Sequence, residues 1–420
     1  MDLREYVINL AKASKIAAKK LSYENTNIKN SALLMMSDAI LENKAYIISE
    51  NAKDIANAKE AGISEAFIDR LTLTEKRLIE MSEGLKATAA LPDPIGEVVK
   101  MWKRPNDLQI GQVRVPLGVI GIIFEARPNV TVDAAALCIK SGNAVILRGG
   151  KEAINSNIAI TKVITKAACA AGLPENSIQL INVIDREAVN IMMKLNEYID
   201  VIIPRGGAGL IKNVVENSTV PVIQTGVGNC HIYVDKDADF SMAENIVINA
   251  KVQRPSVCNA METLLVHKDI AKDFLPHMCE TLKAHKVQIR GCEVTQKIVT
   301  NVEIIPATEE DFKVEFLDLI IAVKVVDSVD AAIDHIFKYG TKHSEAIITN
   351  NYFTSQKFLA EVDAAAVYIN ASTRFTDGGQ FGFGGEIGIS TQKLHARGPM
   401  GLNELTTLKY IIYGNGQIRE

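Results

Sequence analysis

One cysteine of the chain stands in a setting suited to nucleophilic chemistry. Cys258 lies in "VQRPSVCNAMETLLV", after a proline and before an apolar run, and Arg254 precedes it by four residues. A nearby cation favours the thiolate, which is the reactive form of cysteine. Cys138 and Cys169 lie within helical patterns instead, and free cysteines are usually small buried core residues. The residues around Cys258 therefore leave two interpretations open, a nucleophile or a core side chain.

The segment "FEARPNV", residues 124–130, leaves an apolar run that has the length of a strand. Asn129 has an amide that can donate a hydrogen bond to a developing oxyanion, and Arg127 can hold an anionic group of a substrate. The alternative is that Pro128 and Asn129 only form the turn into the next helix.

Glycine pairs end several of the apolar runs, at Gly149-Gly150, Gly206-Gly207 and Gly226-x-Gly228. No Gly-x-Gly-x-x-Gly follows the first run, and the phosphate-binding Gly-x-x-x-x-Gly-Lys pattern is missing, so the glycines alone are weak evidence of a nucleotide site. In "LRGGKEA" the cations Arg148 and Lys151 flank the turn, and two cations there suit the 2′-phosphate of NADPH. A solvated basic turn is the competing interpretation.

Parallel β-sheets are the elements that would bring these residues together. Apolar runs of strand length alternate with helical patterns after residue 118, and the strand candidates are "GVIGIIF", "AVILRGG", "IQLINV", "VIIPRGG" and "PVIQTG". This alternation predicts a parallel sheet with both faces covered. Ligands of such sheets bind beyond the carboxyl ends of the strands, where the glycine turns lie. We expect Thr131 to cap the first helix of this series.

A second series of strands and helices follows over about residues 231–375, with strand candidates "CHIYVD", "METLLVH", "LIIAVKVV", "EAIITN" and "AAAVYIN". The first 90 residues have helical periodicity throughout. Residues 100–116 and the tail "TTLKYIIYGNGQ" have the pattern of edge strands that need a partner, which another subunit would supply. The irregular, glycine-rich stretch 368–401 indicates a loop system over an active site.

Composition excludes several classes of protein. A chain of 420 residues is expected to form two or three domains. Its content of 47% apolar and 23% charged residues is that of an ordinary globular protein. A net charge of -4 argues against a dominant nucleic-acid-binding role. No apolar run is long enough to span a membrane, and the N-terminus fits neither a signal nor a transit peptide. The six cysteines form no Cys-x-x-Cys pair, so we expect a reduced, cytoplasmic protein without a metal.

Three segments together resemble the gamma-glutamyl phosphate reductases, a branch of the aldehyde dehydrogenase superfamily also called glutamate-5-semialdehyde dehydrogenases. The resemblance runs nearly end to end and rests on "GVIGIIFEARPNVTVDAAALCIKSGNAVILRGGKEA", "QRPSVCNAMETLLVH" and, most specifically, "ASTRFTDGGQFGFGGEIGISTQKLHARGPMGLNELTT". It implies two Rossmann-like parallel-sheet domains with a β oligomerisation arm.

The resemblance also implies roles for individual residues. Cys258 matches the superfamily's nucleophile, and Asn129 matches the asparagine that holds the oxyanion together with the cysteine's own backbone N–H. Glu315 in "VEFLDL" aligns with the glutamate that contacts the nicotinamide ribose, and the turn from Arg148 to Lys151 aligns with a cofactor-binding turn. The glycines expected to contact NADP(H) are Gly149, Gly150, Gly206, Gly207 and Gly226.

The implied reaction is the NADPH-dependent reduction of L-glutamate 5-phosphate to L-glutamate 5-semialdehyde and phosphate through a cysteine thioester, a step of proline biosynthesis. Hydrolytic members of the superfamily have "ELGG" before the catalytic domain, and its glutamate activates water; this chain has "TGVG", with Thr225 in that place. A threonine hydroxyl is no general base near neutral pH, which suits an enzyme that transfers its acyl group to phosphate.

The substrate has two kinds of anionic group and an ammonium. We expect Arg127, Arg254 or Arg374 to bind the anionic groups, without an assignment of each arginine to one group. Asp377 or Glu386 is the candidate for the ammonium, and a role in ordering the glycine-rich loop is equally open for Arg374 and Glu386.

The expected domains are an NADP-binding domain of residues 1–102 and 117–230, a catalytic domain of residues 231–390, and an arm of residues 103–116 and 401–420. A homo-oligomer is expected, and a contact with glutamate 5-kinase is left open. Two rival functions remain: a CoA-acylating aldehyde dehydrogenase, which would use the same cysteine, and a catalytically silent scaffold of the same fold.

Overall fold

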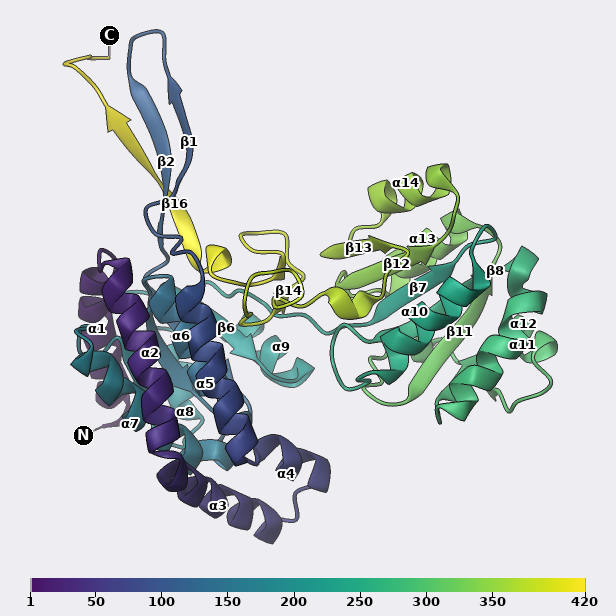
Figure 1. Ribbon diagram of the computed structural model, residues 1–420, viewed down its shortest axis with the longest axis horizontal. Helices are drawn as coiled ribbons and strands as arrows, with labels where there is room; N and C mark the ends of the chain where they lie inside the picture. The colour runs from purple at the N-terminus through teal and green to yellow at the C-terminus, as the bar shows by residue number, and fades with distance from the viewer. Residues whose placement is uncertain (1, 420) are drawn as a thin grey trace. The chain divides into compact units, whose positions relative to one another are not determined.

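The computed structural model describes residues 2–419, except for the side chain of Ala66, and divides the chain into two units (Figure 1). Unit 1 comprises the described residues up to Thr225, Gly382–Gly388 and those from Met400 on, and unit 2 comprises Gly226–Phe381 and Ile389–Pro399. The short stretch 382–388, which we expected in the catalytic domain, therefore belongs to unit 1.

The core of unit 1 is a four-stranded parallel sheet in the order β5-β4-β3-β6. Its strands are β3 (Val119–Phe124), β4 (Ala144–Arg148), β5 (Ile178–Leu180) and β6 (Val201–Arg205). Every residue of β3 and β4 is buried, which explains why both strands are continuous apolar runs without alternation. The carboxyl ends of all four strands lie at one edge of the sheet.

Two local predictions for unit 1 are wrong. The expected strand "PVIQTG" forms only an isolated bridge between Val222 and Ile202, because Pro221 has no N–H to continue a ladder. Thr131 is not a helix cap: α6 begins at Asn129, since Pro128 already has helical dihedral angles. Thr131 is buried within the helix, and its hydroxyl donates to the side chain of Asn157 at 3.0 Å.

Helices cover both faces of the unit 1 sheet. α1, α8 and α9 pack on one face, and α6 and α7 lie on the other, as consecutive right-handed crossovers require. α2 and α3 pack on α7, and α5 packs on α6. The helices are α1 (Leu3–Leu21), α2 (Thr26–Glu42), α3 (Lys44–Glu60), α4 (Glu65–Leu71), α5 (Glu75–Ala90), α6 (Asn129–Lys140), η1 (Lys151–Ala153), α7 (Ile154–Ala170), α8 (Glu187–Met192) and α9 (Ala208–Asn217).

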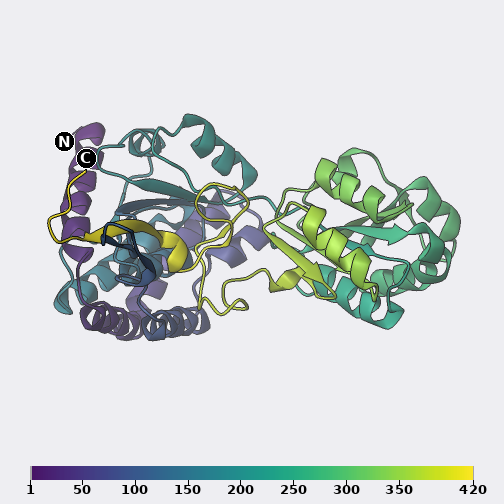
Figure 2. The same cartoon turned by 90° about the horizontal axis from the view of Figure 1, so that it is seen from above.

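A three-stranded antiparallel sheet, which we call the arm, projects from unit 1 (Figure 1). It consists of β1 (Val98–Lys103), β2 (Gln109–Pro116) and β16 (Thr406–Tyr413), in the order β1-β2-β16. Figure 2 shows the yellow β16 along the dark blue β1–β2 hairpin. The arm therefore begins at Val98, before the expected residue 103, and both of its outer strands are edges.

Unit 2 contains a seven-stranded parallel sheet in the order β10-β9-β11-β8-β7-β12-β13. Five of its strands match the predicted apolar runs, whereas β9 and β10 were not predicted because they are short and partly exposed. The strands are β7 (Cys230–Val234), β8 (Met261–His267), β9 (Gln288–Gly291), β10 (Ile305–Pro306), β11 (Ile320–Val326), β12 (Ser344–Ile348) and β13 (Ala366–Ile369).

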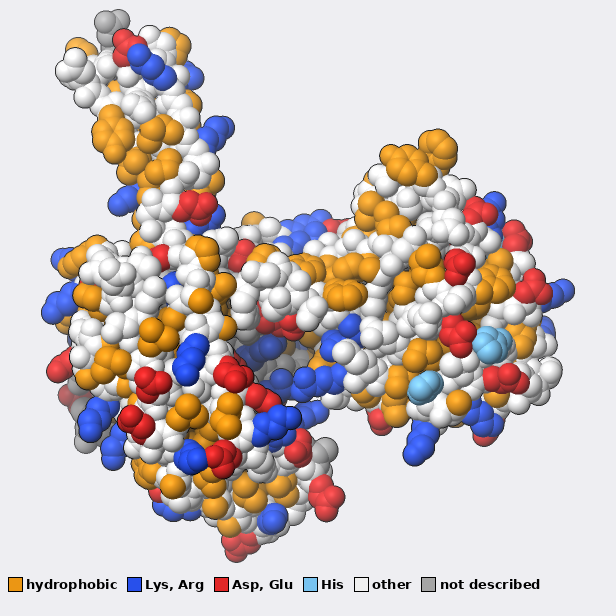
Figure 3. All heavy atoms as spheres, viewed as in Figure 1, with side chains coloured by type: hydrophobic (Ala, Val, Ile, Leu, Met, Phe, Trp, Pro, Cys, Tyr) orange, Lys and Arg blue, Asp and Glu red, His pale blue; other side chains and the backbone are white. Residues whose placement is uncertain are grey.

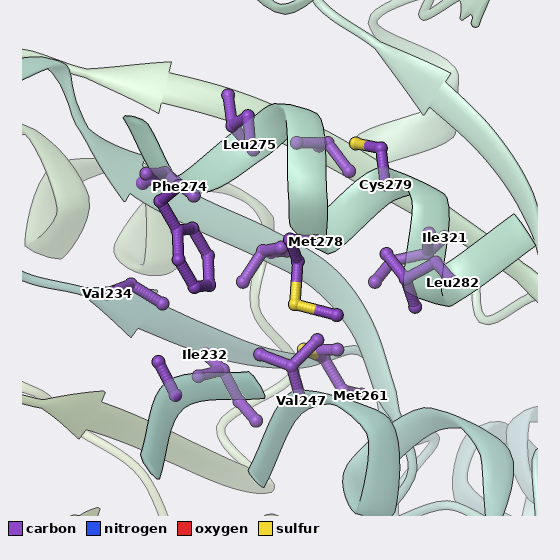
Figure 4. Close-up of a cluster of buried hydrophobic side chains, with 14 of the residues drawn as sticks. Ile232, Val234, Val247, Met261, Phe274, Leu275, Met278, Cys279, Leu282 and Ile321 are labelled. Atoms are coloured by element: carbon purple, nitrogen blue, oxygen red, sulfur yellow. The ribbon is translucent and has the colours of Figure 1, made fainter. Parts of the chain in front are cut away.

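The larger core of unit 2 lies between this sheet and the helices α10 and α11 (Figure 4). Met278 and Phe274 of α11 point toward Ile232 and Val234 of β7 and Val247 of α10. α13 and α14 cover the other face of the sheet. The helices of unit 2 are α10 (Phe240–Val252), α11 (Lys268–Ala284), α12 (Glu293–Ile298), η2 (Glu310–Phe312), α13 (Val329–Tyr339), α14 (Tyr352–Glu361) and η3 (Thr373–Phe375).

The glycine-rich stretch contains little regular structure, as expected. In unit 2 it forms the short pair β14 (Ile389–Ser390) and β15 (Gly398–Pro399), and in unit 1 it leads to η4 (Asn403–Leu405). Asp363, which follows α14, pairs with Lys342, Lys393 and Arg397, and these cations hold the pKa of its carboxyl well below the usual range. Lys393 and Arg397 of the most specific motif thus anchor the loop to the body of unit 2.

Within residues 2–419, no helix has the length and apolar character that crossing a membrane requires.

Candidate active site

Cys258 lies in the turn that joins α10 to β8 in unit 2, and its side chain is partly buried. Two contacts hold the backbone of this turn. The N–H of Ala260 donates to the carbonyl of Val257 at 3.0 Å, and the thiol of Cys230 on β7 donates to the carbonyl of Cys258 at 3.2 Å. The nucleophile candidate is therefore presented by a turn at one end of the buried strand β8.

A buried ion pair closes the base of this turn. Nζ of Lys251, in the last turn of α10, lies 2.6 Å from Oε2 of Glu262 on β8, and both side chains are 0% exposed. Glu262 Oε1 also accepts the N–H of Leu317 at 3.2 Å. Burial raises the pKa of Glu262 to about 7, although Lys251 opposes the shift. Each charge is thus held by a partner, which a buried charge requires.

The other cysteines have settings unsuited to attack on a substrate. Cys138, Cys230 and Cys279 are buried, and burial raises the pKa of each thiol. Burial raises the pKa of Cys169 as well, and Cys292 lies 3.3 Å from the hydroxyl of Thr295. Since the thiolate is the nucleophile, Cys258 is the best candidate of the six.

Two arginines lie in electrostatic range of one another beside Cys258. Burial and the charge of Arg254 both lower the pKa of Arg374, whereas Cys258 acts in the opposite direction. Nε of Arg374 donates to Oε1 of Gln253 at 2.9 Å, which leaves the guanidinium's Nη groups to other partners. The structure therefore brings together Cys258 and two of the three arginines that the sequence suggested.

Asn259, the residue after Cys258, ties η3 to this turn. The Asn259 side-chain amide donates to the backbone carbonyls of Arg374 at 3.3 Å and Thr376 at 2.9 Å, and the backbone carbonyl of Asn259 accepts the hydroxyl of Thr373 at 2.8 Å. The carboxylate of Asp377, a candidate for the substrate's ammonium, accepts the backbone N–H groups of Gly379 and Gln380. The start of the glycine-rich stretch is thereby fixed against the Cys258 turn.

Gly228 contacts the backbone of Cys258 directly. A Cβ atom at position 228 would lie 1.5 Å from the carbonyl oxygen of Cys258, so only glycine fits. Oε1 of Glu315 accepts the N–H of Gly228 at 2.8 Å, and burial raises the pKa of Glu315. Glu315 thus supports the segment that packs on the backbone of Cys258, and its contact with a ribose stays a prediction. Gly226 donates its N–H to the carbonyl of Ile389 at 3.1 Å.

Asn129 is the first residue of α6 and follows the carboxyl end of β3 in unit 1. Its side chain is exposed, and Nδ2 donates to Oδ2 of Asp133 at 2.9 Å. Burial raises the pKa of Asp133 to about 6, against the opposing effects of the Asn129 hydrogen bond and the Arg205 guanidinium. An exposed amide at a strand's carboxyl end, oriented by a carboxylate, is able to donate to a substrate oxygen.

Gly206 and Gly207 lie between β6 and the start of α9. The carboxylate of Glu125 occupies this turn: Oε2 accepts the N–H of Gly207 at 3.1 Å, and a Cβ on Gly206 would lie 2.6 Å from the Glu125 carboxyl carbon. An anion thus already binds the backbone at the start of this helix, as helix N-termini favour.

The two cations of the basic turn have different settings. Arg148 is only 7% exposed, and its guanidinium donates to the carbonyls of Gly149, Ile184 and Asp185. Burial lowers the pKa of Arg148. Lys151, the first residue of η1 after Gly150, is exposed. Arg148 therefore holds together the carboxyl ends of β4 and β5, and Lys151 is the cation of the pair that is open to a ligand.

Thr225 stands where hydrolytic relatives have a glutamate. It is 4% exposed, and its hydroxyl donates to the carbonyl of Pro204 at 2.8 Å.

Arg127 and Glu386 both belong to unit 1, so the structure assigns them to the unit of Asn129 and not to that of Arg374. Among the described residues, no group of three or more His, Cys, Asp or Glu side chains is arranged to hold a metal ion.

Sequence reasoning missed three supporting residues of this site. Asp133 follows Asn129 by four residues, which is the spacing of neighbours on one helix face, so a signal was present. Gln253 and Cys230 gave no signal, because their partners lie 121 and 28 residues away.

Comparison with known proteins gave close likenesses. Residues 11–297 match the model of the aldehyde dehydrogenase family. The gamma-glutamyl phosphate reductase of Clostridium acetobutylicum is 72% identical over 420 residues, which cover 100% of both chains. The crystal structure of gamma-glutamyl phosphate reductase from Thermotoga maritima has 52% identity and a TM-score of 0.97, and the match covers 99% of this chain and 100% of that one.

A more distant likeness concerns the fold alone. An acetylating aldehyde dehydrogenase from Geobacillus thermoglucosidasius has 17% identity and a TM-score of 0.69, with 100% of this chain and 98% of that chain covered. Together with the closer relatives, it confirms the predicted fold class.

Replacing Asp133 by Asn should stabilise the protein above pH 6. The folded-state pKa of about 6 lies above the ordinary aspartate pKa of 3.8, so the penalty for burying the charge is present above pH 6 and is relieved as the pH falls toward 4. Urea unfolding at several pH values, followed by circular dichroism, should show a gain of Asp133→Asn over the wild type that shrinks with acidification. Asp334→Asn, at an exposed position of α13, is the control. A gain independent of pH would contradict the raised pKa.

Proposed function

Because the chain belongs to the gamma-glutamyl phosphate reductases of the aldehyde dehydrogenase family, we propose that it reduces L-glutamate 5-phosphate to L-glutamate 5-semialdehyde and phosphate with NADPH, in proline biosynthesis. The chain is thus an oxidoreductase, and enzymes of its family use nicotinamide cofactors. The observation that carries the proposal is the setting of Cys258, a partly buried thiol beside Arg254 and Arg374.

The first step is attack of the Cys258 thiolate on the acyl carbon of the substrate. The C–S bond forms first and gives a tetrahedral oxyanion, which then collapses with cleavage of the bond from carbon to the phosphate oxygen, so phosphate leaves and a thioester remains. Arg254 and Arg374 favour both anions of this step, the thiolate and the departing phosphate. Arg374 is the better placed of the two to orient phosphate, since Gln253 fixes one edge of its guanidinium.

Two donors are assigned to the oxyanion of the tetrahedral intermediate, the Asn129 amide and the backbone N–H of Cys258. One such donor is typically worth about 3–4 kcal/mol in acyl transfer. The exposed Nδ2 group of Asn129 has two N–H bonds, of which Asp133 takes one, so the other is available to the substrate.

The residues of unit 1 fit a dinucleotide phosphate. Lys151 is exposed at the carboxyl end of β4. The N-terminus of α9 at Gly206-Gly207 can bind an anion, and the Glu125 carboxylate that now lies there would have to move away before a phosphate could take its place. We assign the cofactor's phosphates to these groups, with Gly149 and Gly150 in the turn and Gly226 and Glu315 toward the nicotinamide end. When bound, NADPH supplies the hydride that reduces the thioester. Arg148 would act indirectly, by fixing the conformation of the Gly149-Gly150 turn through its hydrogen bond to the carbonyl of Gly149.

The thioester must survive until it is reduced. Thr225 has its hydroxyl engaged with a carbonyl, and it cannot activate water as a carboxylate would. After reduction the tetrahedral thiohemiacetal releases the aldehyde, and the sulfur regains a proton. Arg127 and Glu386 remain candidates for the substrate's carboxylate and ammonium.

Incubation of the enzyme with L-glutamate 5-semialdehyde and NADP⁺, without phosphate, should place the glutamyl mass on Cys258, because the thioester forms and lacks an acceptor. Peptide mass spectrometry locates the label. Added phosphate or arsenate, and not CoA, should restore turnover. Cys258→Ala should abolish both labelling and turnover, with Cys292→Ala as the matched control. Turnover that requires CoA would favour the CoA-acylating alternative, and no turnover with either acceptor would favour a silent scaffold.

Lys151→Glu should weaken NADPH much more than NADH. A charge-assisted hydrogen bond to phosphate is worth about 1.5–3 kcal/mol, so the KM for NADPH should rise about tenfold or more. Lys166→Glu, at an exposed position of α7, makes the same charge change elsewhere. Equal losses for NADPH and NADH would show that Lys151 does not read the 2′-phosphate.

We also propose that the arm joins copies of this chain. Leu408, Tyr410 and Ile412 alternate along the edge strand β16 and are exposed on one of its faces. Figure 3 shows apolar side chains gathered on the arm. An exposed apolar edge strand is a pairing surface, and native proteins commonly cover it.

Ile412→Lys should therefore lower the molar mass in solution, as measured by sedimentation equilibrium. Lys409→Glu, at the alternate position of the same strand, is the control. An unchanged mass would contradict the role of this face. A cytoplasmic location and a contact with glutamate 5-kinase stay predictions from the sequence.

A further inference from the structure

Asn129 and Asp133 form an isolated side-chain pair on the first turns of α6. They stand four residues apart, which places them on one face of the helix, and the amide Nδ2 donates to the carboxylate at 2.9 Å. Asn129 is exposed, whereas Asp133 is partly buried. The pair therefore points from the helix body toward the carboxyl end of β3.

An ionised carboxylate fixes which end of an amide faces it. The amide has a donor end and an acceptor end on one rotatable group, and a carboxylate can only accept. Rotating the Asn129 side chain by half a turn would place its oxygen against the oxygens of Asp133. Asp133 thus selects the rotamer in which the nitrogen is held and its second N–H is directed elsewhere.

The position of Asp133 partly removes its carboxylate from water, which costs free energy when the group is ionised. Its carboxylate is partly buried, and the one cation identified near it is Arg205 at the end of β6. Arg205 does not form an ion pair with Asp133 within the described residues, so its charge stabilises the carboxylate from a distance. A carboxylate that is partly buried without an ion pair needs a role that compensates for its desolvation. In the described structure, the only hydrogen bond that the Asp133 carboxylate accepts from another side chain comes from Asn129.

We propose that Asp133 is the positioning residue for the Asn129 amide during stabilisation of the oxyanion. Asp133 touches neither substrate nor cofactor in this role. It keeps the amide nitrogen turned outward, so the donor is in place before the tetrahedral intermediate forms. The inference rests on the proposed function, because it assigns to Asn129 the oxyanion of that reaction.

A double-mutant cycle in the full-length protein tests the inference, with phosphate-dependent oxidation of L-glutamate 5-semialdehyde as the assay. Asn129→Ala should lower kcat about 100-fold or more. Asp133→Ala should lower kcat by about 10-fold to 100-fold through misplacement of the donor, with KM changed by less than about twofold. In the Asn129→Ala background, Asp133→Ala should cost no more than about threefold further, because the group that it positions is gone.

Asp133→Asn serves as the conservative variant if Asp133→Ala fails to fold. Its amide can accept the same hydrogen bond but can also donate, so it no longer fixes one orientation of the Asn129 amide and should recover only part of kcat at neutral pH. Asp334→Ala, at an exposed position of α13, should leave kcat unchanged.

Losses that multiply in the double variant would overturn the inference, since they would mean that Asp133 acts independently of Asn129. A rise of KM without a loss of kcat in Asp133→Ala would overturn it as well and make Asp133 a substrate ligand. Asp133→Asn that is as impaired as Asp133→Ala would also count against it. No activity in the wild type would overturn the proposed function instead, so the two failures are distinguishable.

Discussion

The ion pair between Lys251 and Glu262 is the constraint on which the reactive part of unit 2 depends. It joins the last turn of α10 to β8 at the two ends of the segment that carries Cys258. Because neither charge has access to water, each is tolerable only while the other stays within contact distance. The two ends of the turn are thereby fixed, and with them the stretch of backbone from which the Cys258 side chain extends.

Around this point, several polar side chains hold backbone groups. Cys230 holds the carbonyl of Cys258, Glu315 holds the N–H of Gly228, and Asn259 holds η3. Farther away, Asp363 gathers the cations of the glycine-rich stretch. These polar side chains fix main-chain positions through hydrogen bonds and ion pairs. Such contacts allow an irregular loop to keep one conformation. A rigid frame of this kind suits acyl transfer, where donors must stand ready before charge develops.

The fold was predictable where a single segment determined its own structure. β3, β4, β8 and β12 are buried on both faces, so an apolar run was enough to find each strand. β9 and β10 are too short to show a pattern, and their place depends on the neighbouring β11. In the site, the residues around Cys258 left a nucleophile and a core side chain both open, and only the family resemblance singled this cysteine out. The burial of Arg148 was not predictable, since the carbonyls that hold it belong to residues 184 and 185.

The arm combines segments that are far apart in the chain. Gln112 on β2 and Tyr410 on β16 are hydrogen-bonded although 298 residues separate them. During synthesis the β1–β2 hairpin therefore keeps an unpaired edge until all of unit 2 has been made. Most of unit 2, in contrast, is one continuous stretch of chain, so its strands are all present before β16 is synthesised. The pairing of β16 with β2 is consequently delayed until the ribosome has produced nearly every residue of both units.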